Sequence, residues 1–187
     1  LPRALTRSRY TEAIIDVPGK LLLVNQSNSN RAENFVSQLR QALGSLPAAL
    51  PRTAESPTSL MTAWLEQSEA AGNFELDSDC ELKGVGDAAP VIKISKQDLA
   101  ADEVKQHLEH GKICTQLGLV WNNQIRFILN EDMSLKRIQY LDMLQEEAAN
   151  QGDDMESLMT ATQIIMTQNL SLLIQELIDH LGGLIKV

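Results

Sequence analysis

Three side chains of the segment HLEHGKIC, His107, His110 and Cys114, are of types that bind zinc. Two histidines three residues apart share one helix face, so together with a thiolate they could chelate the metal. No CxxC pair accompanies them. We therefore interpret the histidines as solvent-facing residues near a helix C-terminus, where the helix dipole favours cations, and the cysteine as a buried strand residue. We expect no metal and no cofactor.

Carboxylates are the second candidate chemistry. Three acidic pairs, Glu131-Asp132, Glu146-Glu147 and Asp153-Asp154, are adjacent in sequence, so the two side chains of each pair mostly point apart. A glycosidase instead needs two carboxylates that flank one bond. The sequence also contains no Gly-rich phosphate loop, no GxSxG and no HExxH. We expect no catalytic residue, and a hydrolase that uses carboxylates or a metal stays open as an alternative.

Basic side chains are the third candidate chemistry, because a row of cations on one sheet face can follow the phosphates of a nucleic acid. Lys93 alternates with Ile92 and Ile94, so we expect it on the polar face of a strand. The phosphate-contact candidates chosen by charge and position are Lys93, Lys112, Lys136 and Arg137. Solvated surface lysines are the alternative interpretation.

The distribution of charge along the chain is compatible with a nucleic-acid partner, although the net charge is −9. The net charge is +4 over residues 1–52, −7 over 53–90, +1 over 91–137 and −7 over 138–187. A chain of this kind can present a positive surface while its total charge is negative. Scattered, solvated charges would give the same totals.

The composition is that of an ordinary globular chain, with 187 residues, 43% of them hydrophobic. Two cysteines do not make a disulfide framework, so free thiols in a reducing compartment are expected. No apolar run is long enough to span a membrane, and no apolar segment follows the N-terminal arginines as in a secretory signal. Because the chain begins at Leu1, we expect a fragment of a longer protein.

The sequence pattern predicts alternating hairpins and helices. Hairpins are expected at 12–25, around Pro18-Gly19, and at 113–130, around an Asn-Asn turn that tolerates type I′ geometry. Further strands are expected at 73–82 and at 91–94, and the first of these is interpreted as an edge strand. A short strand or turn is expected at 134–138. The predicted helices cover about residues 30–43, 57–65, 102–110, 139–149 and 154–181. All but the one at 139–149 start after an Asn or Ser cap or end at Gly.

This order predicts an α+β protein with antiparallel sheets, flanking helices and a long C-terminal helix. An apolar stripe of the last helix is formed by Leu158, Ile165, Leu173, Leu177 and Leu181. We expect three parts: a hairpin and helix at 1–55, an acidic segment and loop at 56–110, and a second hairpin-helix region at 111–187. One continuous elongated domain is the alternative.

Several strings occur in a fixed order: LPRAL at 1–5, LGSLP at 43–47, KQDL at 96–99, SLKR at 134–137 and LGG at 181–183. With the hairpin around Trp121 and the GK at 111–112, this ordered set resembles the bacterial recombination-associated protein RdgC family. The resemblance covers essentially the whole chain. It implies that the chain corresponds to the C-terminal three-fifths of such a protein.

The resemblance implies a cytoplasmic, nucleoid-associated protein that binds double-stranded DNA with little sequence preference. It also implies a homodimer whose horseshoe-shaped subunits close into a ring around DNA and limit the access of the recombinase RecA. No membrane partner is implied. Such encirclement needs no contact with base edges, which agrees with the lack of a recognition-helix motif.

Lys96 and Gln97 lie on the KQDL string, so the resemblance makes them candidates for the ring-closing or DNA-facing tip. Leu5 stands where the family string has Phe, so an aromatic subunit anchor at that position is absent from this chain. A protein–protein interaction module, with the long C-terminal helix docking on a partner, remains the alternative to DNA binding.

Overall fold

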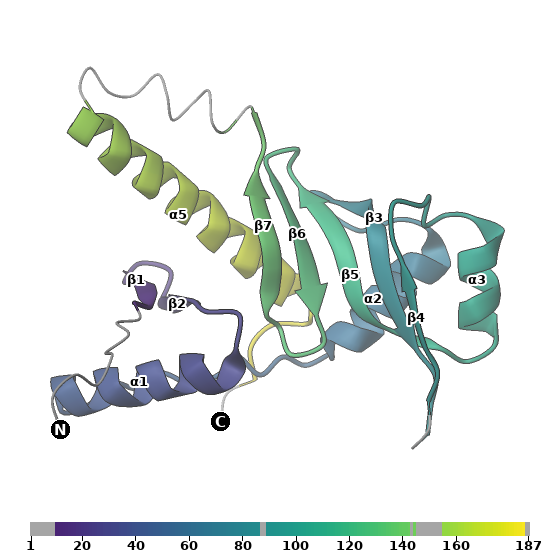
Figure 1. Ribbon diagram of the computed structural model, residues 1–187, viewed down its shortest axis with the longest axis horizontal. Coiled ribbons are helices and arrows are strands. Elements are labelled where there is room, and N and C mark those ends of the chain that lie inside the picture. The colour runs from purple at the N-terminus through teal and green to yellow at the C-terminus, as the bar shows by residue number, and fades with distance from the viewer. Residues whose placement is uncertain (1–9, 87–88, 143, 145–154, 186–187) are drawn as a thin grey trace, which may run out of the picture. The chain divides into compact units, whose positions relative to one another are not determined.

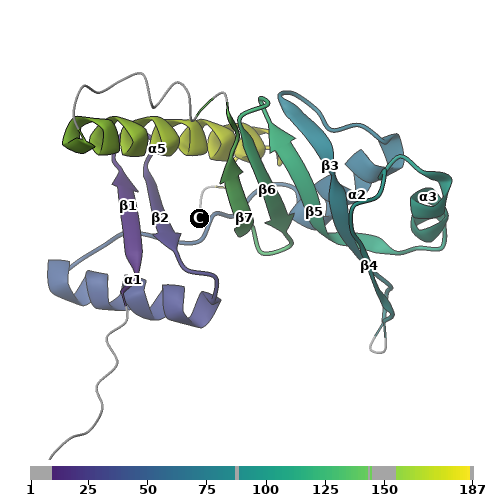
Figure 2. The ribbon, with the colours of Figure 1, turned by 45° about the horizontal axis from the view of Figure 1, so that its top comes forward.

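The computed structural model describes residues 10–86, 89–142, 144 and 155–185, and the chain divides into two compact units, residues 1–50 and 51–187. Figures 1 and 2 show the helices and strands. Both sheets are antiparallel, and a long helix precedes the C-terminus. The structure therefore confirms the α+β class, whereas the three-part division at residues 55 and 110 stays a prediction.

The first unit contains the predicted hairpin and helix, formed by β1 (Glu12–Asp16), β2 (Leu21–Asn25) and α1 (Ser29–Leu43). The helix begins at Asn28, whose side-chain oxygen accepts a hydrogen bond from the backbone N–H of Arg31 at 3.1 Å. It ends at Gly44, whose φ of 75° lies in the left-handed region that glycine adopts without strain. Both ends are fixed by local residues, so the sequence alone predicts them.

The second unit is built on a five-stranded antiparallel sheet with the spatial order β4-β3-β5-β6-β7. Its strands are β3 (Phe74–Lys83), β4 (Val91–Ile94), β5 (Ile113–Trp121), β6 (Ile125–Asn130) and β7 (Leu135–Tyr140). Residues 122–124 join β5 to β6, and the central turn residues Asn122 and Asn123 have φ values of 50° and 53°, as a type I′ turn requires. The connection is one residue longer than the two-residue Asn-Asn loop expected from the sequence, because Trp121 pairs with Ile125.

Two expectations about this sheet need correction. The acidic strand β3 is not an edge strand over its second half, because β4 pairs with Cys80–Lys83 while β5 pairs on the other side. The helix expected from Gln139 is wrong at its first two residues, because β7 continues to Tyr140, which pairs with Ile125. Most of that expected helix, and the predicted break at 150–154, lie outside the described residues.

Helix α2 (Pro57–Gln67) and the C-terminal part of α5 (Met155–His180) pack on one face of the sheet, and α3 (Asp102–Glu109) packs beside α2, as Figure 1 shows. The N-terminus of α2 is capped by Ser56, whose side-chain oxygen accepts from the N–H of Ser59 at 3.1 Å. The core between helices and sheet is aliphatic and aromatic, and its fully buried members include Met61, Leu65, Leu117, Phe127 and Leu129.

The C-terminal half of α5 is held to the sheet by its apolar stripe and by one carboxylate. Of the stripe, Ile165, Leu173, Leu177 and Leu181 are buried, and Leu158 is half-buried. Glu176 accepts hydrogen bonds from the indole N–H of Trp121 at 2.8 Å and from the backbone and side chain of Asn73 at 2.8 and 3.0 Å. These bonds tie α5 to the start of β3 and the end of β5.

The LGG string ends α5 and turns the chain back onto the segment before α2. Gly182 and Gly183 have φ values of 78° and 82°, and the backbone N–H of Gly183 donates to Ile178 at 2.9 Å. The turn lets the N–H of Glu55 donate to the carbonyl of Leu181 at 2.9 Å. Among the described helices, α5 included, we find none that is both long and apolar enough to cross a membrane.

Candidate nucleic-acid interface

The sheet face opposite α2 carries alternating charges, and we call it the open face because no described helix of residues 51–187 covers it (Figure 1). In β3 the residues Phe74, Cys80 and Leu82 are buried, so the acidic residues between them, Glu75, Asp77, Asp79 and Glu81, project from the other face. On β4, Ile92 and Ile94 pack against the core and Lys93 is exposed. The alternation expected for Lys93 is therefore confirmed.

A bulge in β3 brings its carboxylates over the neighbouring strand. The register of β3 against β5 shifts between Leu76 and Cys80, and the intervening segment lies over Gly118 of β5. A Cβ at Gly118 would lie 3.0 Å from the carbonyl oxygen of Asp79 and 3.3 Å from the Cβ of Asp77, so the β3 bulge would have to shift by a few tenths of an ångström to admit a side chain. Glycine at this position therefore permits the two aspartates to approach β6 and β7.

Cations from three strands meet these carboxylates. Arg126 of β6 lies 3.3 Å from Asp77, Arg137 of β7 lies 3.5 Å from Asp79, and Lys93 of β4 lies 3.1 Å from Glu81. Two of these cations are largely solvated, since the side chains of Lys93 and Arg137 are 75% and 73% exposed.

Asp79 connects two of the ordered strings. One of its carboxylate oxygens accepts the backbone N–H of Lys96 at 3.0 Å, while the other faces Arg137. The next backbone N–H, of Gln97, donates to the carbonyl of Ser78 at 3.2 Å. The bulge of β3 thus binds the KQDL loop on one side and the SLKR strand on the other.

The remaining sequence candidates are placed separately. The side chain of Gln97 donates to Glu103 at 2.7 Å, so it is used within the loop and the start of α3. Lys136 lies on the open face. It pairs with Ile128, whose neighbours Phe127 and Leu129 point into the core, so Ile128 and the side chain opposite it point the other way. Lys112 lies on the turn between α3 and β5 and is half-buried. Within the described part of the chain, Lys96, Lys112 and Lys136 take part in none of the ion pairs found.

The residues of zinc-binding type do not form a cluster in the described part of the chain. Cys114 is buried, and its Sγ donates to the carbonyl of Gln116 at 3.2 Å. Burial raises the pKa of the Cys114 thiol well above its ordinary value, and burial with the charge of nearby Asp79 raises the pKa of Cys80 to about 12. The ring of His110 contacts the carbonyl of Gln106. No group of three or more His, Cys, Asp or Glu in these described ranges could hold a metal ion.

Sequence reasoning missed Asp77, Asp79, Gly118 and Arg126 as parts of this surface. The spacing of Glu75, Asp77, Asp79 and Glu81 at every second position was a usable signal, because it predicts one acidic strand face. Nothing local in the sequence shows which cations would meet that face, since that depends on the order of strands in the sheet.

An α+β protein with a charged, uncovered sheet face is the class that this geometry defines. The family model described as "Putative exonuclease, RdgC" matches residues 1–184. The chain is 58% identical to the recombination-associated protein RdgC of Neisseria meningitidis serogroup C (strain 053442) over 98% of its length. It is 49% identical to the protein of that name from Laribacter hongkongensis and 35% identical to that of Pseudomonas paraeruginosa, each over 98% of the chain.

The chain belongs to the RdgC family, as the ordered strings indicated. It spans about three-fifths of the length of the curated relatives it matches, because it covers 61% of the Neisseria protein and 60% of the other two. The expectation that the chain corresponds to three-fifths of a family member is therefore confirmed.

Proposed function

We propose that this chain is part of a non-catalytic, nucleoid-associated cytoplasmic protein that binds double-stranded DNA without sequence preference. The protein acts in recombination as a ring-shaped homodimer that limits the access of RecA. The observation that carries the proposal is the open face, where exposed cations of β4 and β7 are positioned by the β3 carboxylates. The relatives' printed name, recombination-associated protein, supports the cellular role.

The ion pairs of the open face are compatible with phosphate binding. Lys93 and Arg137 are largely exposed, whereas Glu81 and Asp79 are only 16% and 26% exposed, so each pair should contribute about 1 kcal/mol to stability, the upper end of the range for surface pairs. A phosphate can therefore replace the carboxylate at a modest cost. A phosphate contact releases condensed counterions from DNA, which favours the exchange at low salt. Side chains that contact only the DNA backbone give affinity without sequence preference.

The exonuclease wording of the family model would require a different arrangement of the acidic residues. Two-metal nucleases hold their ions between carboxylates. In this chain Asp77, Asp79 and Glu81 each face a cation at 3.1–3.5 Å. This pairing supports the non-catalytic proposal.

Releasing Lys93 should strengthen DNA binding. In the unmodified chain the Thr115 hydroxyl donates to a carboxylate oxygen of Glu81 at 3.0 Å. In Glu81→Gln the amide oxygen can still accept this hydrogen bond, but the negative charge that holds Lys93 is removed. We expect roughly fivefold tighter binding at low salt and nearly the same slope of log affinity against log salt, because Lys93 contacts phosphate in both proteins and only the cost of breaking its ion pair is removed. Fluorescence anisotropy with a labelled duplex measures both quantities.

Glu131→Gln is the matched control, because Glu131 is exposed on the β6–β7 turn and the change in net charge is the same. An equal gain in both variants would attribute the effect to net charge and contradict a contact at Lys93. Comparing this chain with the intact protein in a gel shift tests whether DNA binding resides in residues 1–187.

The surface of α5 supports the homodimer. Its residues 157–175 contain no charged side chain, and Met159, Ile164 and Leu172 are more than half exposed. A helix with so little charge loses little solvation free energy when a second copy packs against it. Two-fold homodimers are the commonest assembly of soluble oligomers.

We therefore expect this chain to dimerise at tens of micromolar in sedimentation velocity, and Ile164→Glu to shift it to monomer because a charge enters the contact. Gln163→Glu places the same charge at the adjacent exposed position and should have a smaller effect. Observing only monomer for the unmodified chain would place the subunit contact elsewhere in the protein.

A further inference from the structure

Strand β3 has neighbours on both sides for only part of its length. β4 pairs with Cys80–Lys83, whereas no described strand lies beside Phe74–Asp77 on that side. The bulge after Leu76 separates the two halves. The first half of β3 is therefore an edge, although the second half is internal.

The backbone of Leu76 points its N–H and C=O toward this edge. The N–H of Asn122 donates to the carbonyl of Asn73 at 2.8 Å, so residue 73, and by alternation residue 75, bonds toward β5. Residues 74, 76 and 78 then point the other way. The carbonyl of Ser78 confirms this direction, because it accepts the N–H of Gln97 at 3.2 Å.

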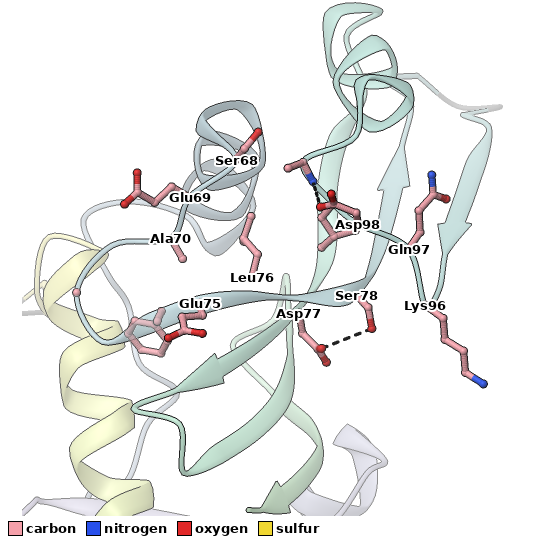
Figure 3. A pocket seen from close by; sticks show the side chains of 14 residues that line it. Ser68, Glu69, Ala70, Glu75, Leu76, Asp77, Ser78, Lys96, Gln97 and Asp98 are labelled. Carbon is pink, nitrogen blue, oxygen red and sulfur yellow. Dashed lines mark hydrogen bonds between the residues drawn. The ribbon is translucent and has the colours of Figure 1, made fainter.

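A cleft of about 870 Å³ lies along the edge, lined by residues 68–70 after α2, by Phe74–Ser78 and by the KQDL loop. Figure 3 shows Leu76 pointing into the space between Ala70 and Asp98, with Lys96 pointing away from it. Four residues of extended chain span about 14 Å, the length of the unpaired edge. The cleft thus offers room for one added strand.

The walls of the cleft differ on the two sides of such a strand. On the helix side the floor is apolar, because Phe74 and Leu99 are buried and Leu76 is half-buried. On the open-face side Glu75 is exposed and takes part in none of the ion pairs found within the described ranges. Glu69 and Asp98 add negative charge to the lining, in which Lys96 is the one cation.

Strand β4 already shows which sequence suits this edge. Its Ile92 and Ile94 pack against the core, while Lys93 pairs with Glu81 across the strands at 3.1 Å. A strand placed beside Phe74–Asp77 would repeat this pattern, with apolar side chains next to Leu76 and a basic side chain next to Glu75.

We propose that the Phe74–Asp77 edge binds an extended segment of another protein by strand addition, and that this segment alternates apolar and basic residues. Main-chain hydrogen bonds to Leu76 supply affinity, and the alternating walls supply specificity, as in other domains that bind peptides at a sheet edge. This inference is independent of DNA binding by the open face.

The probe is an acetylated and amidated peptide, Ile-Lys-Val-Lys-Val-Lys-Ile, compared with Ile-Val-Val-Ile-Lys-Lys-Lys, which has the same composition without alternation. Fluorescence anisotropy of the labelled peptides measures binding to the 187-residue chain. We expect the alternating peptide to bind at least about tenfold more tightly, since only it matches both walls. Amide hydrogen exchange at Leu76 should slow when that peptide is bound.

Two charge reversals complete the test. Glu75→Lys should weaken binding of the alternating peptide about tenfold by placing like charges together, whereas Glu131→Lys, outside the cleft, should change it less than about twofold. Circular dichroism checks that each variant folds, and hydrogen exchange in the unmodified chain gives a readout that needs no variant.

Equal binding of both peptides would show general attraction to an acidic protein and overturn the proposal. Absence of binding, or of protection at Leu76, would also overturn it, because the acidic edge would then only keep other strands away. If the alternating peptide instead dissociates a dimer of the chain, the edge belongs to a second copy and not to another protein.

Discussion

Replacing Glu176 with alanine is expected to lower the free energy of unfolding of the 51–187 unit by about 3 kcal/mol, because three hydrogen bonds to a carboxylate are lost. The largest part of this cost comes from Trp121, which is only 4% exposed, so its indole N–H finds little water once its acceptor is removed. The bonds from Asn73 contribute less, because that residue is exposed and water can replace the carboxylate. Urea denaturation followed by tryptophan fluorescence measures the change.

Glu176→Gln tests the role of charge at nearly constant volume, and Asp179→Asn, on the same helix, is the control that should leave stability nearly unchanged. Partial burial alone would raise the pKa of Glu176, but hydrogen bonds from Asn73 and Trp121, with nearby His180, outweigh it and lower the pKa. The carboxylate therefore stabilises the fold above its unfolded pKa of about 4.3 and loses this contribution as pH falls through the lower folded value.

The stability difference between the unmodified chain and Glu176→Ala should accordingly be constant near neutral pH and shrink in acid. A difference that grows as the pH falls would contradict a carboxylate that is stabilised in its charged form. A change below about 0.5 kcal/mol at neutral pH would show that α5 is held by its apolar stripe alone.

Elements whose ends depend on neighbouring residues could be predicted from the sequence. Asn28 and Ser56 cap helices, and Gly44 ends one. Asn122 and Asn123 adopt the positive φ values of the turn between β5 and β6. Each of these residues acts within a few positions along the chain. The helix prediction at Gln139 was wrong because this residue pairs with Arg126 of β6, and sheet pairing overrides a local helical pattern.

The candidate site could be predicted only in part for the same reason. Alternation was enough to place Lys93 on an exposed strand face, and an acidic strand was visible in the sequence. Asp79 binds both the backbone of Lys96 and the side chain of Arg137. This arrangement depends on the strand order, on the bulge of β3 and on the small size of Gly118. These are long-range features, and no spacing rule along the chain encodes them.

Double-stranded DNA binding by the intact protein should weaken about a hundredfold when the salt concentration rises from about 50 to about 200 mM, for about four phosphate contacts. Each contact contributes about −0.9 to the slope of log affinity against log salt. Duplexes of different sequence should give the same affinity and slope, since contacts to the backbone carry no sequence information. A flat salt response, or strong preference for one duplex, would argue for base contacts or another function.

Lys96→Glu, measured in the same titration, separates the two roles open to the KQDL loop. The backbone of Lys96 is held by Asp79 whatever its side chain is, so this exposed substitution should change stability by less than about 0.5 kcal/mol. If the ammonium group contacts phosphate, affinity should fall about tenfold at low salt and the slope should decrease by about one unit. If it closes the ring, dimerisation should weaken while the slope stays the same.

Lys20→Glu is the matched control, because Lys20 is also exposed and its φ of 54° is close to the 57° of Lys96. The two variants therefore carry the same change of charge in the same backbone conformation, and they differ only in place. An equal loss of affinity in both would reflect net charge rather than a contact at the loop. Unchanged affinity, slope and oligomeric state in Lys96→Glu would leave Lys96 as a solvated surface residue, and the phosphate contacts would then have to come from other cations, with Lys136 and Arg137 the next to test.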